Sequence, residues 1–359
     1  MLRNVLMFLY VISTTSYIIP IHMSLPPISR RDAVSIVASS SLLLFTEQNQ
    51  NNPICVIGAS GQTGIECVKQ LAKQHKMIKA ISRKPIALQN MEDLDAYEKN
   101  YIKHYNLDIK NNEKLNDIIK DSSSVIFLAN AKKYNKYVKP DIEEQTYEDV
   151  DVYGLQNVVK ACIKNKIPRL VYTSASCRSC SLDESADTDK MSGIKCENCR
   201  SKQKGENIIR QHYNKVNNPS IGYTIVRVGF LINGIFNGDS RGVKELEINQ
   251  DYTKSGMISK YDLAELCINA ASNPNAACTT FEVYYADTAQ PFDIEESLHK
   301  CTNLGKSVEE CFFGSAYKNS KPQSLDEVRN APIQGSIFST GKEKRGINWQ
   351  ELFQDLQKD

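Results

Sequence analysis

Short apolar runs alternate with longer amphipathic segments along the chain after Asn52. A short apolar run predicts a buried strand, and apolar residues recurring every three or four positions predict a helix. The elements expected in this first part are a strand at 54–57, a helix at 64–74, a strand at 77–81, a helix at 112–120 and a strand at 124–128. Strands that alternate with helices in this way are typical of βαβ units on a parallel sheet.

The same alternation continues through the middle of the chain. Residues 149–164 place apolar side chains at helical spacing, and a strand at 170–173, a helix at 203–213 and a strand at 223–228 follow. After about Gly234 the alternation is lost, so we expect a smaller C-terminal α/β part that covers the carboxyl edge of the sheet and lies on the substrate side. The pattern therefore predicts an α/β fold with a doubly wound parallel sheet.

Composition excludes two classes of protein. The chain has 41% hydrophobic and 24% charged residues, and no stretch approaches the roughly 20 apolar residues of a membrane span. Its 44 basic and 42 acidic residues are mixed along the sequence and leave a net charge of +2. Such a chain lacks the basic surface that drives nucleic-acid binding. We expect neither an integral membrane span nor a nucleic-acid partner.

The first 50 residues have the pattern of a targeting leader. Residues 1–31 contain no Asp or Glu, and Arg3 precedes the apolar run 5–13, as in a signal peptide. A second apolar run at 33–45 follows Arg30-Arg31, as in a twin-arginine export signal. Two signals in tandem resemble the leaders of nucleus-encoded plastid proteins, the second addressing the thylakoid lumen. The alternatives are the secretory pathway and a helix at 33–45 that packs on the fold.

A glycine-rich turn follows the first expected strand and opens the first expected helix. Its sequence is Gly58-x-x-Gly61-x-x-Gly64. Glycines allow a tight turn and close backbone approach, and a helix N-terminus presents free amides to a pyrophosphate. The residues expected to contact a dinucleotide here are Gly58, Ser60, Gly61, Gln62, Thr63 and Gly64. The context predicts a Rossmann-type nucleotide site.

The end of the second strand indicates which dinucleotide is bound. NAD-preferring sites place an acidic residue about 20 positions after the glycines to bind the ribose 2′-hydroxyl. This chain instead has Ser82-Arg83-Lys84, and Arg83 suits a 2′-phosphate, which favours NADP(H). Asp108 is expected to bound the adenine pocket and Ala129 to line the nicotinamide ribose; either is alternatively a strand-end residue.

Several motifs occur in the order typical of one family. They are GASGQTG at 58–64, ISRKP at 81–85, VDVYGLQNVVKAC at 150–162, RLVYTSA at 169–175, KQKGE at 202–206, YTIVRVG at 223–229 and ISKYDLAELC at 258–267. On these motifs residues 54–283 resemble the atypical short-chain dehydrogenase/reductases with NmrA-like, NAD(P)-binding members. The resemblance implies cofactor contacts at the glycine turn and Arg83, and a position facing the nicotinamide for Ser174.

The catalytic residues are less clearly marked. Reductases of this kind use a Tyr-x-x-x-Lys pair in which the phenol donates a proton. The chain has this spacing only at Tyr317 and Lys321, far from Ser174, which we attribute to chance. The expected catalytic residues are therefore Ser174, Lys202 and Lys204, with Glu206 orienting the lysine. The alternative for the two lysines is a solvated helix face.

Four cysteines form two Cys-x-x-Cys motifs, Cys177/Cys180 and Cys196/Cys199, 15 residues apart. This spacing is typical of a structural zinc site with four thiolate ligands. In an oxidising compartment the same residues would instead form disulfides beside the nicotinamide pocket. We expect structural zinc, with disulfides as the alternative.

The expected organisation has three parts: a leader at 1–50, a nucleotide-binding domain at 51–300 with a cysteine-rich insert at 175–203, and a C-terminal extension at 301–359. The expected function is that of an NADPH-dependent oxidoreductase acting on a small carbonyl, quinone or isoprenoid-like substrate. One alternative is a non-catalytic NADP(H)-binding redox sensor or assembly scaffold that binds a protein complex in the plastid. Another is an epimerase or isomerase on the same frame.

Overall fold

The computed structural model describes residues 52–131, 146–177, 180, 185–188, 194–232, 240–250, 252–292, 299, 302–303, 305, 307 and 343–359. The expected leader, Tyr317 and Lys321 lie outside these residues. In the part of the chain that the structure describes, no helix has both the length and the hydropathy that a membrane crossing requires.

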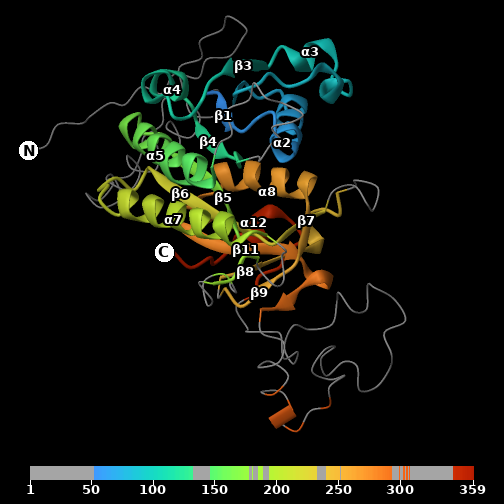
Figure 1. The fold of residues 1–359 in the computed structure, drawn as a ribbon. Helices are drawn as coiled ribbons and strands as arrows, with labels where there is room; N and C mark the ends of the chain where they lie inside the picture. Colours follow the sequence, from blue (N-terminus) through green and yellow to red (C-terminus); the bar gives the residue numbers. More distant parts are fainter. Residues whose placement is uncertain are drawn as a thin grey trace, which may run out of the picture. The chain divides into compact units, whose positions relative to one another are not determined.

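Eight strands form the main sheet of the described chain (Figure 1). They are β1 (Ile54–Ile57), β2 (Ile78–Ser82), β3 (Ile102–Asn106), β4 (Ser124–Phe127), β5 (Arg169–Ala175), β6 (Gly222–Val228), β8 (Leu246–Asn249) and β11 (Thr279–Tyr285). Their order is β3-β2-β1-β4-β5-β6-β11-β8, and every pair is parallel except β11 with β8. The order reverses between β1 and β4, which is the switch point of a doubly wound sheet. The predicted fold class is confirmed.

Helices cover both faces of the sheet. One face carries α2 (Gln62–Lys73) and α8 (Lys260–Ser272), whereas the other carries α4 (Asn112–Ile119), α5 (Leu155–Lys164) and α7 (Cys196–Tyr213) (Figure 1). Successive strand residues point to opposite faces, as the two-residue period requires. Val56 therefore lies in the core under α2 and α8, while Cys55 and Ile57 lie in the core under α5 and α7.

Shorter elements complete the described fold. The short helices are η1 (Leu88–Met91), α3 (Ala96–Lys99), the π-helical η2 (Asp149–Gly154), η3 (Val243–Glu245), η4 (Pro274–Ala276), η5 (Ala286–Thr288) and α12 (Trp349–Leu352). Two small sheets pair β7 (Phe230–Ile232) with β10 (Met257–Ser259), and β9 (Lys254–Ser255) with β12 (Gln290–Pro291). Residues beyond Gly234 thus contribute two strands and α8 to the main layers, which the sequence pattern did not predict.

The start of α7 is the largest difference from the expected elements. The apolar pattern predicted this helix from residue 203, but α7 begins at Cys196, inside the cysteine-rich insert. Its first two turns contain buried Cys196, Cys199 and Lys202. Because cysteine is only weakly apolar and lysine is charged, apolar periodicity does not mark this part of the helix.

Candidate functional site

A cleft of about 660 Å³ lies at the carboxyl ends of β1, β2, β4 and β5. Its size is within the range of small-molecule sites. The expected residues that line it are Gly58, Ser60, Gly61, Gln62, Thr63, Ser82, Arg83, Asp108, Ala129, Ser174 and Lys202. Residues from five different loops or strand ends therefore meet in one place, at the switch point where ligands bind in open α/β sheets.

The glycine turn has the backbone geometry of a phosphate-binding loop. Gly58 has φ +85°, and a Cβ there would lie 2.6 Å from the Ala129 backbone nitrogen. Gly61 is the N-cap of α2, so the first amides of the helix face the cleft without a side-chain cap. Gly64 does not line the cleft; a Cβ on it would lie 2.1 Å from the Gly58 carbonyl oxygen. Gly64 lets the helix approach the turn, Gly58 lets the turn approach the Ala129 backbone, and Gly61 leaves room for a ligand.

Arg83 follows β2 and lines the cleft half-buried. Within the described chain its guanidinium forms no hydrogen bond or ion pair, although Lys84 beside it does. Ser82 is engaged, since its hydroxyl donates to the Lys84 carbonyl at 2.6 Å and contacts His104 Nε2 at 2.9 Å. Arg83 therefore offers a positive charge and a fork of N–H donors to an anion in the cleft.

Asp108 and Ala129 occupy the ends of the flanking strands. Asp108 lines the cleft, and one of its oxygens accepts a hydrogen bond from the Lys110 amide at 2.9 Å. Ala129 lies against Gly58 on the opposite side of the turn. Both positions agree with the walls of a nucleotide pocket that the sequence predicted.

Lys202 is held beneath the cleft by a buried ion pair. Its ammonium lies 2.8 Å from Asp151 Oδ1 and donates to the Thr173 carbonyl at 3.0 Å. The Tyr172 hydroxyl donates to the same Asp151 oxygen at 3.1 Å. Burial raises the pKa of the Asp151 carboxyl, while Lys202 and Tyr172 oppose that rise. An ammonium has three N–H donors, so this arrangement uses two and aims Lys202 at the cleft.

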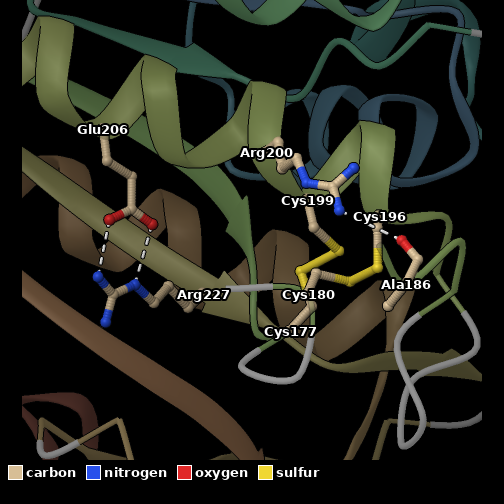
Figure 2. Close-up of a disulfide and its surroundings, with 8 residues drawn as sticks. All are labelled: Cys177, Cys180, Ala186, Cys196, Cys199, Arg200, Glu206 and Arg227. Carbon is tan, nitrogen blue, oxygen red and sulfur yellow. Dashed lines mark hydrogen bonds and ion pairs between the residues drawn. A yellow bond between two sulfur atoms is a disulfide. The ribbon is translucent and has the colours of Figure 1, made fainter. Parts of the chain in front are cut away.

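Lys204 and Glu206 do not belong to the cleft. Lys204 is exposed on the far side of α7 and pairs with Glu148. Glu206 is buried but receives hydrogen bonds from Arg227 at 2.7 and 2.9 Å (Figure 2). Burial acts to raise the pKa of Glu206, but Arg227 outweighs it and holds that pKa below its usual value. Lys204 therefore lies away from the cleft in which its catalytic role was expected, and Glu206 binds Arg227 instead of a lysine.

Ser174 is the penultimate residue of β5 and lines the cleft. Its hydroxyl is buried near the Glu206 carboxylate, but it does not meet hydrogen-bond geometry with any described residue.

Asn198 also lines the cleft, and the sequence analysis missed it. It stands four residues before Lys202, where a reductase of the expected type has its tyrosine. The signal that could have found it is the spacing Asn198-x-x-x-Lys202, which becomes visible once α7 is known to begin at Cys196.

The four cysteines are paired as disulfides, Cys177 with Cys199 and Cys180 with Cys196 (Figure 2). Each bond joins one Cys-x-x-Cys motif to the other, with Cα–Cα distances of 6.1 and 5.2 Å. Among the described residues, no group of three or more His, Cys, Asp or Glu side chains could hold a metal ion. The zinc expectation is not supported, because disulfide sulfurs are not the thiolates that a zinc site needs.

The sheet order, the glycine turn and the cleft define a Rossmann protein with a dinucleotide-type site. The chain belongs to the NAD(P)H-binding family, whose model matches residues 58–274, more than half of its length. This match does not confirm the NmrA-like branch named above.

Individual relatives are more distant. A short-chain dehydrogenase/reductase family 42E member 1 from Xenopus laevis is 34% identical over 67 residues, which is 19% of this chain and 17% of that protein. An oxidoreductase from Lactococcus lactis is 18% identical, with a TM-score of 0.47 over 70% of this chain and 97% of its own. A short-chain dehydrogenase/reductase superfamily protein from Agrobacterium tumefaciens, with bound NAD, is 15% identical, with a TM-score of 0.47 over 70% of this chain and 83% of its own.

Proposed function

We propose that this protein is an NADPH-dependent oxidoreductase acting on a small carbonyl, quinone or isoprenoid-like substrate. The observation that carries the choice of NADP(H) is the unpaired, half-buried Arg83 guanidinium in the cleft. A 2′-phosphate would give it the charged partner that it lacks within the described residues.

The residues present fit the cofactor. The free amides at the start of α2 suit the pyrophosphate, and Lys202 suits a hydroxyl of the nicotinamide ribose. When bound, NADPH would supply a hydride to the substrate. Asp151 lies 2.8 Å from the Lys202 ammonium, so the ion pair positions the group that would hold the ribose.

Nucleotide titration tests this proposal. We expect NADPH to bind at least tenfold more tightly than NADH, about 1.4 kcal/mol. We also expect slow NADPH oxidation with simple aldehydes, and a Tyr317→Phe variant should retain all of it. Equal affinity for the two nucleotides would contradict the NADP(H) assignment, and loss of turnover in a folded Tyr317→Phe variant would contradict the proposed site.

A second candidate function is favoured by the disulfides. They link the end of β5, which carries Ser174, to the first turn of α7, which precedes Lys202. Reduction would free two segments that line the cleft, so the protein would act as a redox sensor, or a scaffold for a plastid complex, whose NADP(H) affinity depends on thiol state.

Comparing NADPH affinity before and after dithiol reduction tests the second function. A sensor should change its affinity at least fivefold, and a Cys177→Ser/Cys199→Ser double variant should match the reduced protein. Cys278→Ser is the control, because Cys278 is free and lies outside the insert. Unchanged affinity would remove the sensor function and leave the oxidoreductase.

We propose plastid localisation, in the thylakoid lumen if the second apolar run acts as an export signal, with the secretory pathway as the alternative. Disulfides persist in oxidising compartments, which supports export from the cytosol. A fluorescent protein fused after residues 1–50 should enter the plastid; fluorescence retained in the cytosol would contradict the leader.

A further inference from the structure

Asn198 and Lys202 lie one helical turn apart on the same face of α7. Residues at i and i+4 are neighbours on a helix surface, and both side chains line the cleft. Asn198 therefore stands where a Tyr-x-x-x-Lys reductase has the phenol that touches the substrate oxygen. The helix position of that tyrosine is thus occupied by a carboxamide in place of a phenol.

The Asn198 side chain is buried without a protein partner. Its residue is only 9% exposed, and Oδ1 is fully enclosed with no hydrogen-bond partner in the described structure. A buried amide atom left unsatisfied is unfavourable, and such groups normally have a partner. Nδ2 is not among the enclosed atoms and has no hydrogen-bond partner in the described structure, so the N–H end of the amide is the one that a ligand in the cleft can reach.

The two disulfides fix this turn of the helix. Cys196 and Cys199 stand on either side of Asn198, and both are bonded to the segment that follows β5. Asn198 is thereby held at a constant distance from Ser174 at the end of that strand. A hydrogen-bond donor held rigidly in advance is what stabilises charge that develops on a substrate oxygen.

Asparagine and tyrosine do different chemistry at this position. A phenol, with a pKa of about 10, can transfer a proton, whereas a carboxamide donates a hydrogen bond and keeps its proton. Hydride addition to an isolated aldehyde or ketone yields an alkoxide. An alkoxide is about as basic as hydroxide, because the pKa of its alcohol is close to that of water, about 15.7. That product needs an acid. Hydride addition to a conjugated carbonyl compound yields a delocalised anion that hydrogen bonds alone can stabilise.

We propose that Asn198 is a catalytic residue that donates Nδ2–H to the substrate oxygen, and that the substrate is a conjugated enone, of which a quinone is a cyclic case. The inference rests on the proposed NADPH-dependent function. The substrate's β-carbon gains the hydride that bound NADPH supplies, and the C=C and C=O π electrons shift to leave the negative charge on oxygen. Water later protonates the α-carbon, and NADP⁺ is the oxidised product.

Binding of 4-nitrophenolate to the NADP⁺-loaded protein tests the role of Asn198 without turnover. This delocalised oxyanion reports its own ionisation by its absorbance. We expect Asn198→Ala to weaken 4-nitrophenolate binding at least tenfold. Asn198→Asp has nearly the same shape but can only accept hydrogen bonds, so it should raise the pKa of the bound phenol above the value in wild type. Asn207→Ala is the matched control on the exposed face of α7 and should change neither.

Substrate choice provides the second measurement. Wild type should reduce an enone at least tenfold faster than the corresponding saturated aldehyde. The Asn198→Tyr variant restores Tyr-x-x-x-Lys, and it should lower this enone-to-aldehyde rate ratio at least tenfold. Two results would overturn the inference in a protein that still binds NADP⁺. One is equal phenolate binding by wild type and Asn198→Ala, and the other is faster reduction of the aldehyde than of the enone by wild type. Failure of wild type to bind NADP(H) would overturn the proposed function itself.

Discussion

The proposed preference for NADP(H) rests on Arg83, which lines the cleft and has no partner among the described residues. Replacing it with alanine should reduce NADPH affinity at least tenfold and leave NADH affinity within about twofold, because only NADPH carries the 2′-phosphate. Lys103→Ala, which removes an exposed cation outside the cleft, is the control for net charge. An Arg83→Ala variant that still prefers NADPH would show that another group binds the phosphate.

Gly61 and Gly64 should fail in different ways when changed. A Cβ on Gly61 would meet only the Gly58 carbonyl oxygen at 3.1 Å, so Gly61→Val should fold but lose both nucleotides as its side chain enters the phosphate site. A Cβ on Gly64 would lie 2.1 Å from that oxygen, so Gly64→Ala should lower the free energy of unfolding by about 1–3 kcal/mol.

Thermal unfolding and nucleotide titration of both variants check this pair. A Gly61→Val variant that is unfolded, or that binds NADPH normally, would contradict the assignment of this backbone to the phosphates. A Gly64→Ala variant as stable as wild type would contradict its role in helix–turn packing.

At the scale of elements, a row of ion pairs joins α7 to the sheet. Arg227 on β6 pairs with Glu206 of α7 at 2.7 Å and with Glu282 at 3.0 Å, which stands directly opposite on β11. All three side chains are largely buried, so the pairs are weakly screened. The row fixes α7, and with it Asn198 and Lys202, over the carboxyl end of β5.

This row predicts a pH-dependent stability. Burial raises the pKa of Glu282 from 4.5 to about 7, although Arg227 opposes the rise. The folded protein therefore binds the Glu282 proton more tightly than the unfolded chain. The contribution of Glu282 to the free energy of unfolding is fully present below pH about 4.5 and is lost as the pH rises through about 7.

Denaturant unfolding from pH 5 to pH 8 measures the effect. Between these limits the free energy of unfolding of wild type should fall relative to that of Glu282→Gln by up to about 3 kcal/mol, since one pKa unit corresponds to about 1.4 kcal/mol. Curves that stay parallel over this range would show that Glu282 is ionised throughout.

At the scale of the whole molecule, residues 49–359 form one compact unit. A chain of residues 49–359 should fold alone and bind NADPH within about twofold of the full chain, because the cleft is built within this unit. NADPH at about 100 times its Kd should stabilise both chains by about 2.7 kcal/mol. Loss of binding on truncation would show that the first 48 residues contribute to the site.

The sequence predicted most of the nucleotide half of the site. Gly58, Gly61 and Arg83 were found because the fingerprint depends on local spacing after a strand, and all three line the cleft. The sequence left two candidates for the lysine in the cleft, Lys202 and Lys204. They are two residues apart, and the sequence does not show which one faces inward. In the structure α7 turns Lys202 to Asp151 and Lys204 to Glu148.

The sequence by itself determined the α/β layers, because the strand and helix periods are local features of the chain. A buried strand must also be covered by helices on both faces. The sequence did not determine where β8 and β11 join the sheet, or the ion-pair row from Glu206 to Glu282, because these contacts join residues far apart in the chain. The cysteine spacing was compatible with both metal and disulfide. Only the tertiary structure decided between them, because it places Cys177 against Cys199 and Cys180 against Cys196, and so brings Asn198 to the cleft.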